Sequence, residues 1–148
     1  MKGDPVPPPD HVARHCRYTD LIWHGGQSVA VTEAAFRPRA GEDDGLSVNW
    51  VEFFLGSRPH NLLCVRSVTK LQVKDSHRIA LIQVEDLTQA AAPIANLSVV
   101  QDPDENLPPQ ANAAHALIRP IANLQDTIVR QRIASRVKPG DLYPYKLP

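Results

Sequence analysis

The segment from residue 31 to residue 50 carries the clearest secondary-structure signal in the chain. Apolar and polar side chains alternate over residues 46–50, which is typical of a strand with one buried face. A second extended run is predicted over residues 34–38. Between the two runs, Gly41 and Gly45 bracket three acidic residues that favour a solvated turn. Two strands joined by a charged loop therefore form the predicted centre of the fold.

Further strands and helices intermingle along the rest of the chain. Helices are predicted over residues 61–72 and 126–137, where apolar residues recur every three or four positions. The other predicted strands are short apolar or alternating runs, at residues 11–17, 78–84, 97–101 and 113–118. This order predicts a single compact α+β domain with a mixed sheet of about five strands and two main helices.

Two segments are assigned less specifically. Residues 51–55 form a run too short for periodicity to decide between strand and helix. Residues 104–112 are rich in proline and asparagine, which predicts a surface loop.

Proline marks both ends of the chain. Residues 1–10 favour an extended polyproline conformation or disorder, because proline cannot donate a backbone hydrogen bond. Residues 138–148 again combine proline with glycine. We therefore expect a proline-rich tail, a domain over residues 11–137 and a C-terminal tail with Tyr143 and Tyr145 as docking contacts.

The overall charge argues against nucleic acid as the main partner. The formal net charge is +0 and the sequence pI is about 7.0, so no global field attracts a polyanion. RNA binding would need a local basic patch. The candidate patch is a set of basic side chains on and just after the last predicted helix: Arg130, Arg132, Arg136 and Lys138.

Membrane and secretory signals are not found in the sequence. No apolar run approaches the roughly 20 residues of a membrane helix. No secretory signal follows Met1, since charged residues and proline interrupt at once. The expected location is therefore the cytoplasm, without membrane contact.

The sequence predicts neither a metal site nor a cofactor. Cys16 and Cys64 show no paired spacing, which is typical of buried free thiols in a reducing compartment. His11 and His15 are four residues apart, but a shared metal would require a helix where an extended run is predicted.

His115 is the first candidate for chemistry. In an extended segment it shares a strand face with Leu117 and Arg119, just after the predicted loop. A histidine beside an arginine can bind a phosphate or carboxylate, or act as an acid or base. The alternative is a half-buried strand histidine with its ring nitrogens bonded to the backbone.

Arg14 and Ser47 form a second candidate set. Their order resembles that in ADP-ribosyltransferase-type folds, which hold a dinucleotide with an early Arg or His, followed by a Ser and a later Glu. Glu52 or Glu85 matches the last position by residue type. The resemblance implies a nucleotide- or NAD-handling enzyme with His115, Arg14 and Ser47 as catalytic residues. The alternative is an arginine in a surface ion pair and a serine on an edge strand.

Three basic residues complete the predicted site as binding residues. They lie close in sequence to the catalytic candidates: His15, Arg17 and Arg119.

Three stretches of the sequence are considered together: residues 11–14, residues 31–36 leading into 46–48, and residues 99–103 preceding 113–116. In this order they resemble a loose group of small, uncharacterised bacterial proteins with the pattern AAF…LSV…DP…N.AHA and without an established activity. The resemblance implies a compact bacterial domain and singles out Phe36, Ser47 and His115. The chain departs from the pattern at Leu117, where an acidic or polar residue is expected, and this argues against a Glu-dependent reaction.

Two functions remain open at this point. No catalytic signature is complete, the net charge is zero and both ends are rich in proline, which favours a non-enzymatic accessory protein that binds another protein. The alternative is the nucleotide- or NAD-handling enzyme. It requires the side chains of Arg14, Ser47 and His115 to converge on one cleft, and positions on opposite faces of the sheet would rule it out. The sequence does not indicate an oligomeric state.

Overall fold

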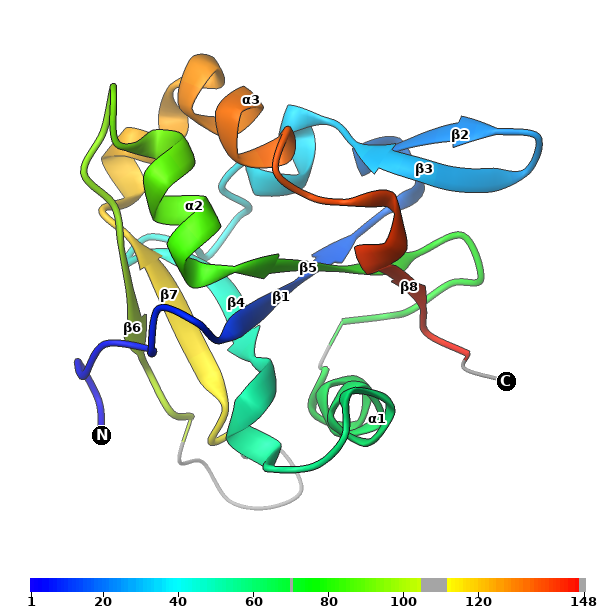
Figure 1. The fold of residues 1–148 in the computed structure, drawn as a ribbon, viewed down its shortest axis with the longest axis horizontal. Coiled ribbons are helices and arrows are strands. Elements are labelled where there is room, and N and C mark those ends of the chain that lie inside the picture. Colours follow the sequence, from blue (N-terminus) through cyan, green and yellow to red (C-terminus); the bar gives the residue numbers. More distant parts are fainter. Residues whose placement is uncertain (70, 105–111, 147–148) are drawn as a thin grey trace.

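A computed structural model describes residues 1–69, 71–104 and 112–146 of the chain. Its centre is an antiparallel sheet with the strand order β6-β7-β4-β1-β5-β8 (Figure 1). The strands are β1 (His11–Cys16), β4 (Leu46–Trp50), β5 (Arg78–Gln83), β6 (Ser98–Gln101), β7 (His115–Arg119) and β8 (Leu142–Pro144). The predicted α+β domain is confirmed, with a main sheet of six strands where about five were expected.

All ladders of this sheet are antiparallel in the described residues, whereas the sequence led us to expect a mixed sheet. The reason lies in the connection from β4 to β5 through α1 (Arg58–Val68). This crossover joins two strands that run in the same direction. Strand β1 lies between them and is antiparallel to both, so no parallel pair forms.

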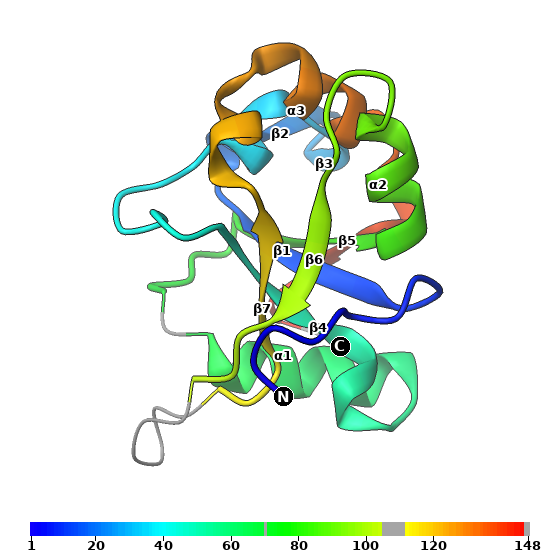
Figure 2. The same cartoon turned by 90° about the vertical axis from the view of Figure 1, so that its left-hand side faces the viewer.

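Helical layers lie on both sides of the sheet (Figures 1 and 2). One layer contains α2 (Val84–Ala91), α3 (Thr127–Ala134) and the 3-10 helices η2 (Glu33–Phe36) and η4 (Ile121–Gln125). The other layer is made of α1 with η3 (Val51–Phe54), so residues 51–55 are neither strand nor α-helix.

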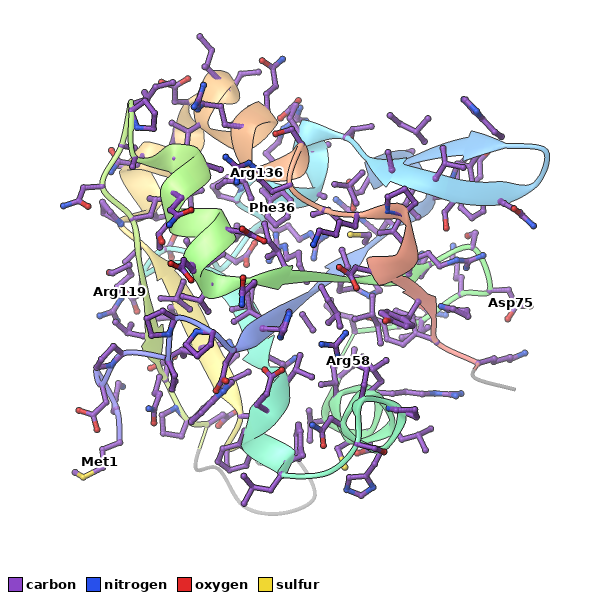
Figure 3. All side chains as sticks on the ribbon, viewed as in Figure 1. Met1, Phe36, Arg58, Asp75, Arg119 and Arg136 are labelled. Carbon is purple, nitrogen blue, oxygen red and sulfur yellow. The ribbon has the colours of Figure 1, made fainter. Side chains whose placement is uncertain are left out.

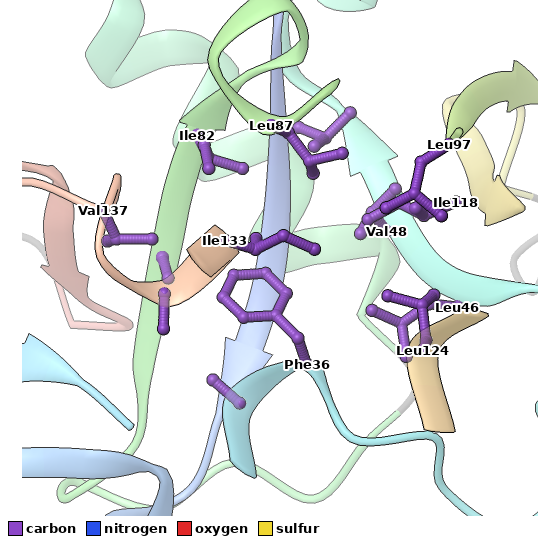
Figure 4. Close-up of a cluster of buried hydrophobic side chains, with 14 of the residues drawn as sticks. Phe36, Leu46, Val48, Ile82, Leu87, Leu97, Ile118, Leu124, Ile133 and Val137 are labelled. Carbon is purple, nitrogen blue, oxygen red and sulfur yellow. The ribbon is translucent and has the colours of Figure 1, made fainter. Parts of the chain in front are cut away.

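Each layer packs on one face of the sheet and buries a separate hydrophobic cluster there. On the α2/α3 side, Phe36 lies at the centre of the larger cluster, with Ile133 and Leu87 around it (Figure 4). On the α1 side, Leu62 and Val65 pack on strand residues such as Leu81. In β1 and β5, alternate residues face opposite clusters, as expected for side chains that point to the two faces of a sheet in turn.

The segment before β4 corrects one prediction. Residues 34–38 do not form a strand: Thr32 accepts a hydrogen bond from the Ala34 backbone N–H and begins η2 instead. The strand of this region is β3 (Gln27–Val31), which pairs with β2 (Leu21–His24) in a projecting hairpin (Figure 1). Phe36 is buried, but from a helical turn.

Helix α1 also begins earlier than predicted. Ser57 caps it by accepting from the His60 backbone N–H, so the helix starts three residues before Asn61 and ends at Val68. In contrast, α3 begins where expected, because Asp126 accepts from the Ile128 backbone N–H.

Both segments expected as tails pack on the sheet. Backbone hydrogen bonds join Val6 N to Val99 O at 3.0 Å and Gln101 N to Asp4 O at 2.8 Å, beside the edge strand β6. At the other edge, β8 pairs with β5, and Tyr145 is buried just after it. Most of the loop predicted over residues 104–112 lies outside the described residues.

Of the four basic residues predicted as a patch on and after the last helix, Arg130 is buried, and Arg132, Arg136 and Lys138 are exposed. Arg130 is 5% exposed and donates to the Glu33 carboxylate at 2.6 Å. Arg132 donates to the Ala90 carbonyl oxygen, so both side chains hold α3 against its neighbours. Arg136 stays exposed beside α3 (Figure 3).

Candidate functional site

A cleft of about 610 Å³ opens on the α1 side of the sheet. Its floor is formed by residues of β1, β4 and β7, and one wall by Val65 and Val68 near the end of α1. Helix α1 packs over β1 and β5, and the cleft lies beside it over β4 and β7. The volume is in the range of small-molecule sites, about 300–1,000 Å³.

Strand alternation places polar side chains on the cleft floor. In β4, Leu46 and Val48 face the larger hydrophobic cluster, so Ser47 and Asn49 face the cleft. His115 in β7 lies directly opposite Asn49 in the antiparallel register. Ser47 is therefore a diagonal neighbour of His115 on the same face.

His115 bridges Asp102 and Ser47. Its Nδ1 lies 2.9 Å from the Asp102 carbonyl oxygen and 3.2 Å from the Asp102 carboxylate. Its Nε2 lies 3.1 Å from Ser47 Oγ. Because a carbonyl oxygen can only accept, Nδ1 carries the ring proton in the neutral form, and Nε2 accepts the Ser47 hydroxyl proton. The serine, histidine and aspartate thus have the geometry of a nucleophile, its base and an orienting acceptor.

A pair of amides lies beside this array. Asn112 accepts from the Ala114 backbone N–H, which orients its amide and directs its Nδ2 to Asn49 Oδ1 at 2.6 Å. Within the described residues, Asn49 Nδ2 is left without an acceptor of its own. Asn49 therefore offers an amide donor on the cleft floor, two residues from Ser47.

Arg14 reaches the cleft but presents no free donor to it. It is 2% exposed, and its five N–H donors meet five oxygens of the protein. The acceptors are three carbonyl oxygens and two carboxylate oxygens: Ala35 O, Arg37 O, Ser47 O, and Glu42 Oε1 and Oε2. The alternative role expected for Arg14 was a surface ion pair; the structure shows a buried ion pair with Glu42 instead.

Glu42 corrects the prediction of a fully solvated acidic turn. Its side chain is 9% exposed and also accepts from the backbone N–H groups of Arg39 and Ser47. Burial raises the pKa of Glu42, but the hydrogen bond and charge of Arg14 outweigh it, and the net pKa is lowered. The buried guanidinium needs this counterion.

His15 also lines the cleft, next to Arg39. Its Nδ1 is 2.5 Å from the Tyr145 hydroxyl oxygen, and its ring packs edge-on against His77. Burial, followed by the charge of Arg39, lowers the pKa of His15 to about 4. His15 is therefore neutral near pH 7, and its contacts with Tyr145 and His77 hold the ring in place.

The structure brings together four of the six predicted site residues. These are the four that line the cleft: Arg14, His15, Ser47 and His115. Arg17 is 55% exposed beside Asp20 and lies outside it. Arg119 donates to the Asp44 carbonyl oxygen and lies on the β6–β7 side of the molecule (Figure 3), also outside the cleft.

The two glutamates considered for a late catalytic position do not reach the cleft. Glu52 accepts from His11 Nδ1 at 2.8 Å near η3, and Glu85 lies in the first turn of α2. Neither side chain lines the cleft. Among the described residues, Glu42 is the glutamate that does, and it is already paired with Arg14.

Sequence reasoning missed Asp102 and Asn49 as site residues. One signal was available: Asp102 follows β6 and His115 begins β7, so an antiparallel pairing of these two runs would place both residues at the same end. Alternation in β4 likewise places Asn49 on the face of Ser47.

The part of the chain that the structure describes contains no group of three or more His, Cys, Asp or Glu side chains arranged to hold a metal ion. Across the same residues, no helix combines the length and the apolar character that a membrane span requires. Neither cysteine forms a disulfide, and burial raises the pKa of the Cys16 thiol to about 12.

Comparisons with protein-family models, curated proteins and solved structures found no match to this chain. The chemistry of the cleft is therefore inferred from its own geometry.

Proposed function

We propose that this protein is an enzyme that cleaves an ester or a related acyl bond through a covalent intermediate on Ser47. The observation that carries the proposal is the position of His115, with one ring nitrogen on Ser47 Oγ at 3.1 Å and the other on Asp102. The cleft around these residues is large enough for a small-molecule substrate.

The reaction begins with attack of Ser47 Oγ on the carbonyl carbon of the substrate. The hydroxyl proton passes to His115 Nε2, and the Nδ1–H then lies between the Asp102 carbonyl and carboxylate oxygens, which stabilise the imidazolium. When the tetrahedral intermediate collapses, the leaving alcohol takes the proton from Nε2. Water, deprotonated by the same nitrogen, then attacks the acyl carbon; the Oγ–C bond breaks, the acid leaves and Nε2 returns the proton to Ser47 Oγ.

Asn49 is the proposed donor to the negative oxygen of that intermediate. Its Nδ2 has no acceptor among the described residues, and Asn112 fixes its orientation by donating to Asn49 Oδ1. A preformed donor of this kind stabilises charge that develops only in the transition state.

The nucleotide- or NAD-handling enzyme expected from the sequence is less well supported in its original form. Ser47 and His115 share the cleft floor, but the Arg14 side chain leaves β1 on the opposite face of the sheet, together with Val12 and Cys16. In addition, Arg14 was to hold the phosphates, and all five of its donors are bound to protein oxygens. A phosphate would have to displace Glu42 from a buried ion pair.

Ester turnover tests the proposal. With p-nitrophenyl esters, Ser47→Ala and His115→Ala are each expected to lower kcat/KM by about 10²- to 10⁴-fold, since they remove the nucleophile or its base. Asp102→Asn should lower it as well. Ser98→Ala, which removes an exposed serine in β6, is the matched control and should leave turnover unchanged. Wild-type turnover in Ser47→Ala would contradict the proposal.

A protein-binding role is the second candidate, favoured by the projecting β2–β3 hairpin (Figure 1). Tyr18, stacked on Trp23 beside the hairpin, is 57% exposed, and Ile22 within it is 41% exposed. Under this proposal, Ile22→Asp abolishes capture of a partner in a pull-down while Ser47→Ala does not. Equal capture by wild type and Ile22→Asp would count against it.

A further inference from the structure

Arg39 is the second arginine of the cleft, and its bonding differs from that of Arg14. It lies in the loop between η2 and β4 and lines the cleft next to His15 and Glu42. Its side chain is 18% exposed. The guanidinium is anchored on one side only, by Nη2, which donates to the His15 carbonyl oxygen at 2.6 Å and to the Asp20 carboxylate at 3.2 Å.

The remaining donors of Arg39 are not used by the described protein. Nε is buried without an acceptor, and Nη1 makes no hydrogen bond among the described residues. A guanidinium has five N–H donors, and a donor left unpaired in a buried position is costly. An oxyanion in the cleft would supply an acceptor for Nη1, since Nε is enclosed by protein atoms, and a planar guanidinium suits a carboxylate or phosphate.

The carboxylates near Arg39 are shared with other arginines. Glu42 is paired with Arg14, and Asp20 is contacted both by Arg39 and by the exposed Arg17. Arg39 therefore has no carboxylate of its own among these ion pairs. Burial, followed by the Arg14 charge, lowers the pKa of Arg39.

The backbone of Arg39 is tied to that of Ser47 through Glu42. The Glu42 carboxylate accepts from Arg39 N with one oxygen at 2.7 Å and from Ser47 N with the other at 2.6 Å. One carboxylate therefore spans the backbones of the two residues. At the far side of the cleft, the apolar wall of Val65 and Val68 suits the uncharged part of a substrate.

We propose that Arg39 forms an anion subsite, so that the substrate of the Ser47 reaction carries a carboxylate or phosphate group. The proposal rests on the function proposed above. It assigns Arg39 to substrate binding, with Arg14 as the buried support that holds Glu42 in place.

A matched pair of esters tests the subsite. Mono-p-nitrophenyl adipate carries a carboxylate that p-nitrophenyl hexanoate lacks. Arg39→Gln is expected to lower kcat/KM for the adipate by about 10- to 100-fold and to change that for the hexanoate by less than about twofold. Arg39→Lys should recover part of the loss. Arg136→Gln removes an exposed arginine elsewhere and should change neither substrate. An equal loss on both esters, or no loss on either, would overturn the subsite.

Wild-type protein gives an answer that does not depend on the folding of a variant. Adipate or inorganic phosphate should inhibit hexanoate turnover competitively, and neutral 1,6-hexanediol should not. Inhibition by adipate alone assigns a carboxylate substrate, and inhibition by phosphate alone assigns a phosphorylated one. Equal inhibition by the diol, or none by either anion, would overturn the proposal.

Binding to Ser47→Ala separates the two proposals. In this variant, adipate or phosphate binding is measured by NMR titration, with and without Arg39→Gln. Arg39-dependent binding without ester turnover in the wild type would support the subsite and contradict the acyl-transfer function. Turnover in the wild type without Arg39-dependent binding would support that function and contradict the subsite.

Discussion

Arg14 and Arg39 show how two residues of one type acquire different roles in one cleft. Arg14 is enclosed by oxygens that accept all its donors, so its charge and shape are used to hold the loop before β4. Arg39 is fixed at Nη2 and leaves the rest of its guanidinium unsatisfied. Burial alone does not distinguish a structural arginine from a binding one; the count of acceptors does.

The Arg14–Glu42 pair leads to a stability prediction. Arg14→Met leaves the Glu42 carboxylate buried without its counterion, and we expect the free energy of unfolding to fall by about 3–5 kcal/mol. The measurement is urea unfolding at pH 7. Arg37→Met, which removes an arginine that is 59% exposed and paired with Glu33, is expected to cost about 0–1 kcal/mol.

A double variant checks the cause of that loss. Adding Glu42→Gln to Arg14→Met removes the unpaired charge, so part of the lost stability should return. If Arg14→Met is no less stable than Arg37→Met, the buried pair does not hold this part of the fold.

His15 predicts a pH dependence of stability. Its pKa is lowered from an ordinary 6.5 to about 4, so the unfolded chain binds more protons than the native protein between these values. The stabilising contribution of the neutral form is present above pH 6.5 and is lost as the pH falls toward about 4. Chemical unfolding across this window should show a smaller decline for His15→Gln than for the wild type. An equal decline in the two proteins would mean that carboxylates, and not His15, cause the loss of stability.

At the scale of elements, the sequence predicted the strands and helix starts that depend on neighbouring residues. Alternation located β4 with its correct bounds, and Asp126 marked the start of α3. Residues 34–38 were assigned incorrectly because a cap at Thr32 favours a helical turn over a strand. The N-terminal segment packs on the sheet through backbone bonds with distant residues of β6, which composition does not reveal, whereas Tyr145, an expected docking contact, is buried.

The cap of α3 provides a prediction at this scale. Asp126→Ala removes the acceptor of the Ile128 N–H, which lies 2.8 Å from the carboxylate, and should lower the free energy of unfolding by about 1 kcal/mol. Urea unfolding measures the change. Asp75→Ala, at a carboxylate that is 83% exposed, is the control and should be nearly neutral. A loss as small as that of the control would mean that the cap does not contribute.

At the scale of the whole molecule, the site depends on strand order. Ser47, Asp102 and His115 are far apart in sequence and meet because β7 pairs with both β4 and β6. The sequence pointed to Ser47 and His115 as residues, but their contact depends on a register that only the assembled sheet defines. Asp102 was outside the prediction for the same reason. The cleft beside α1 then lies over these side chains.

The most direct test of the central claim is covalent labelling of the folded wild-type protein with a fluorophosphonate, read by intact mass and peptide mapping. An activated serine displaces fluoride and retains the phosphonyl group, whatever the natural substrate is. One adduct at Ser47, absent in Ser47→Ala and strongly slowed in His115→Ala, is the predicted result. An unlabelled wild-type protein, or labelling at Ser47 that proceeds equally fast in His115→Ala, would contradict the claim that His115 activates Ser47.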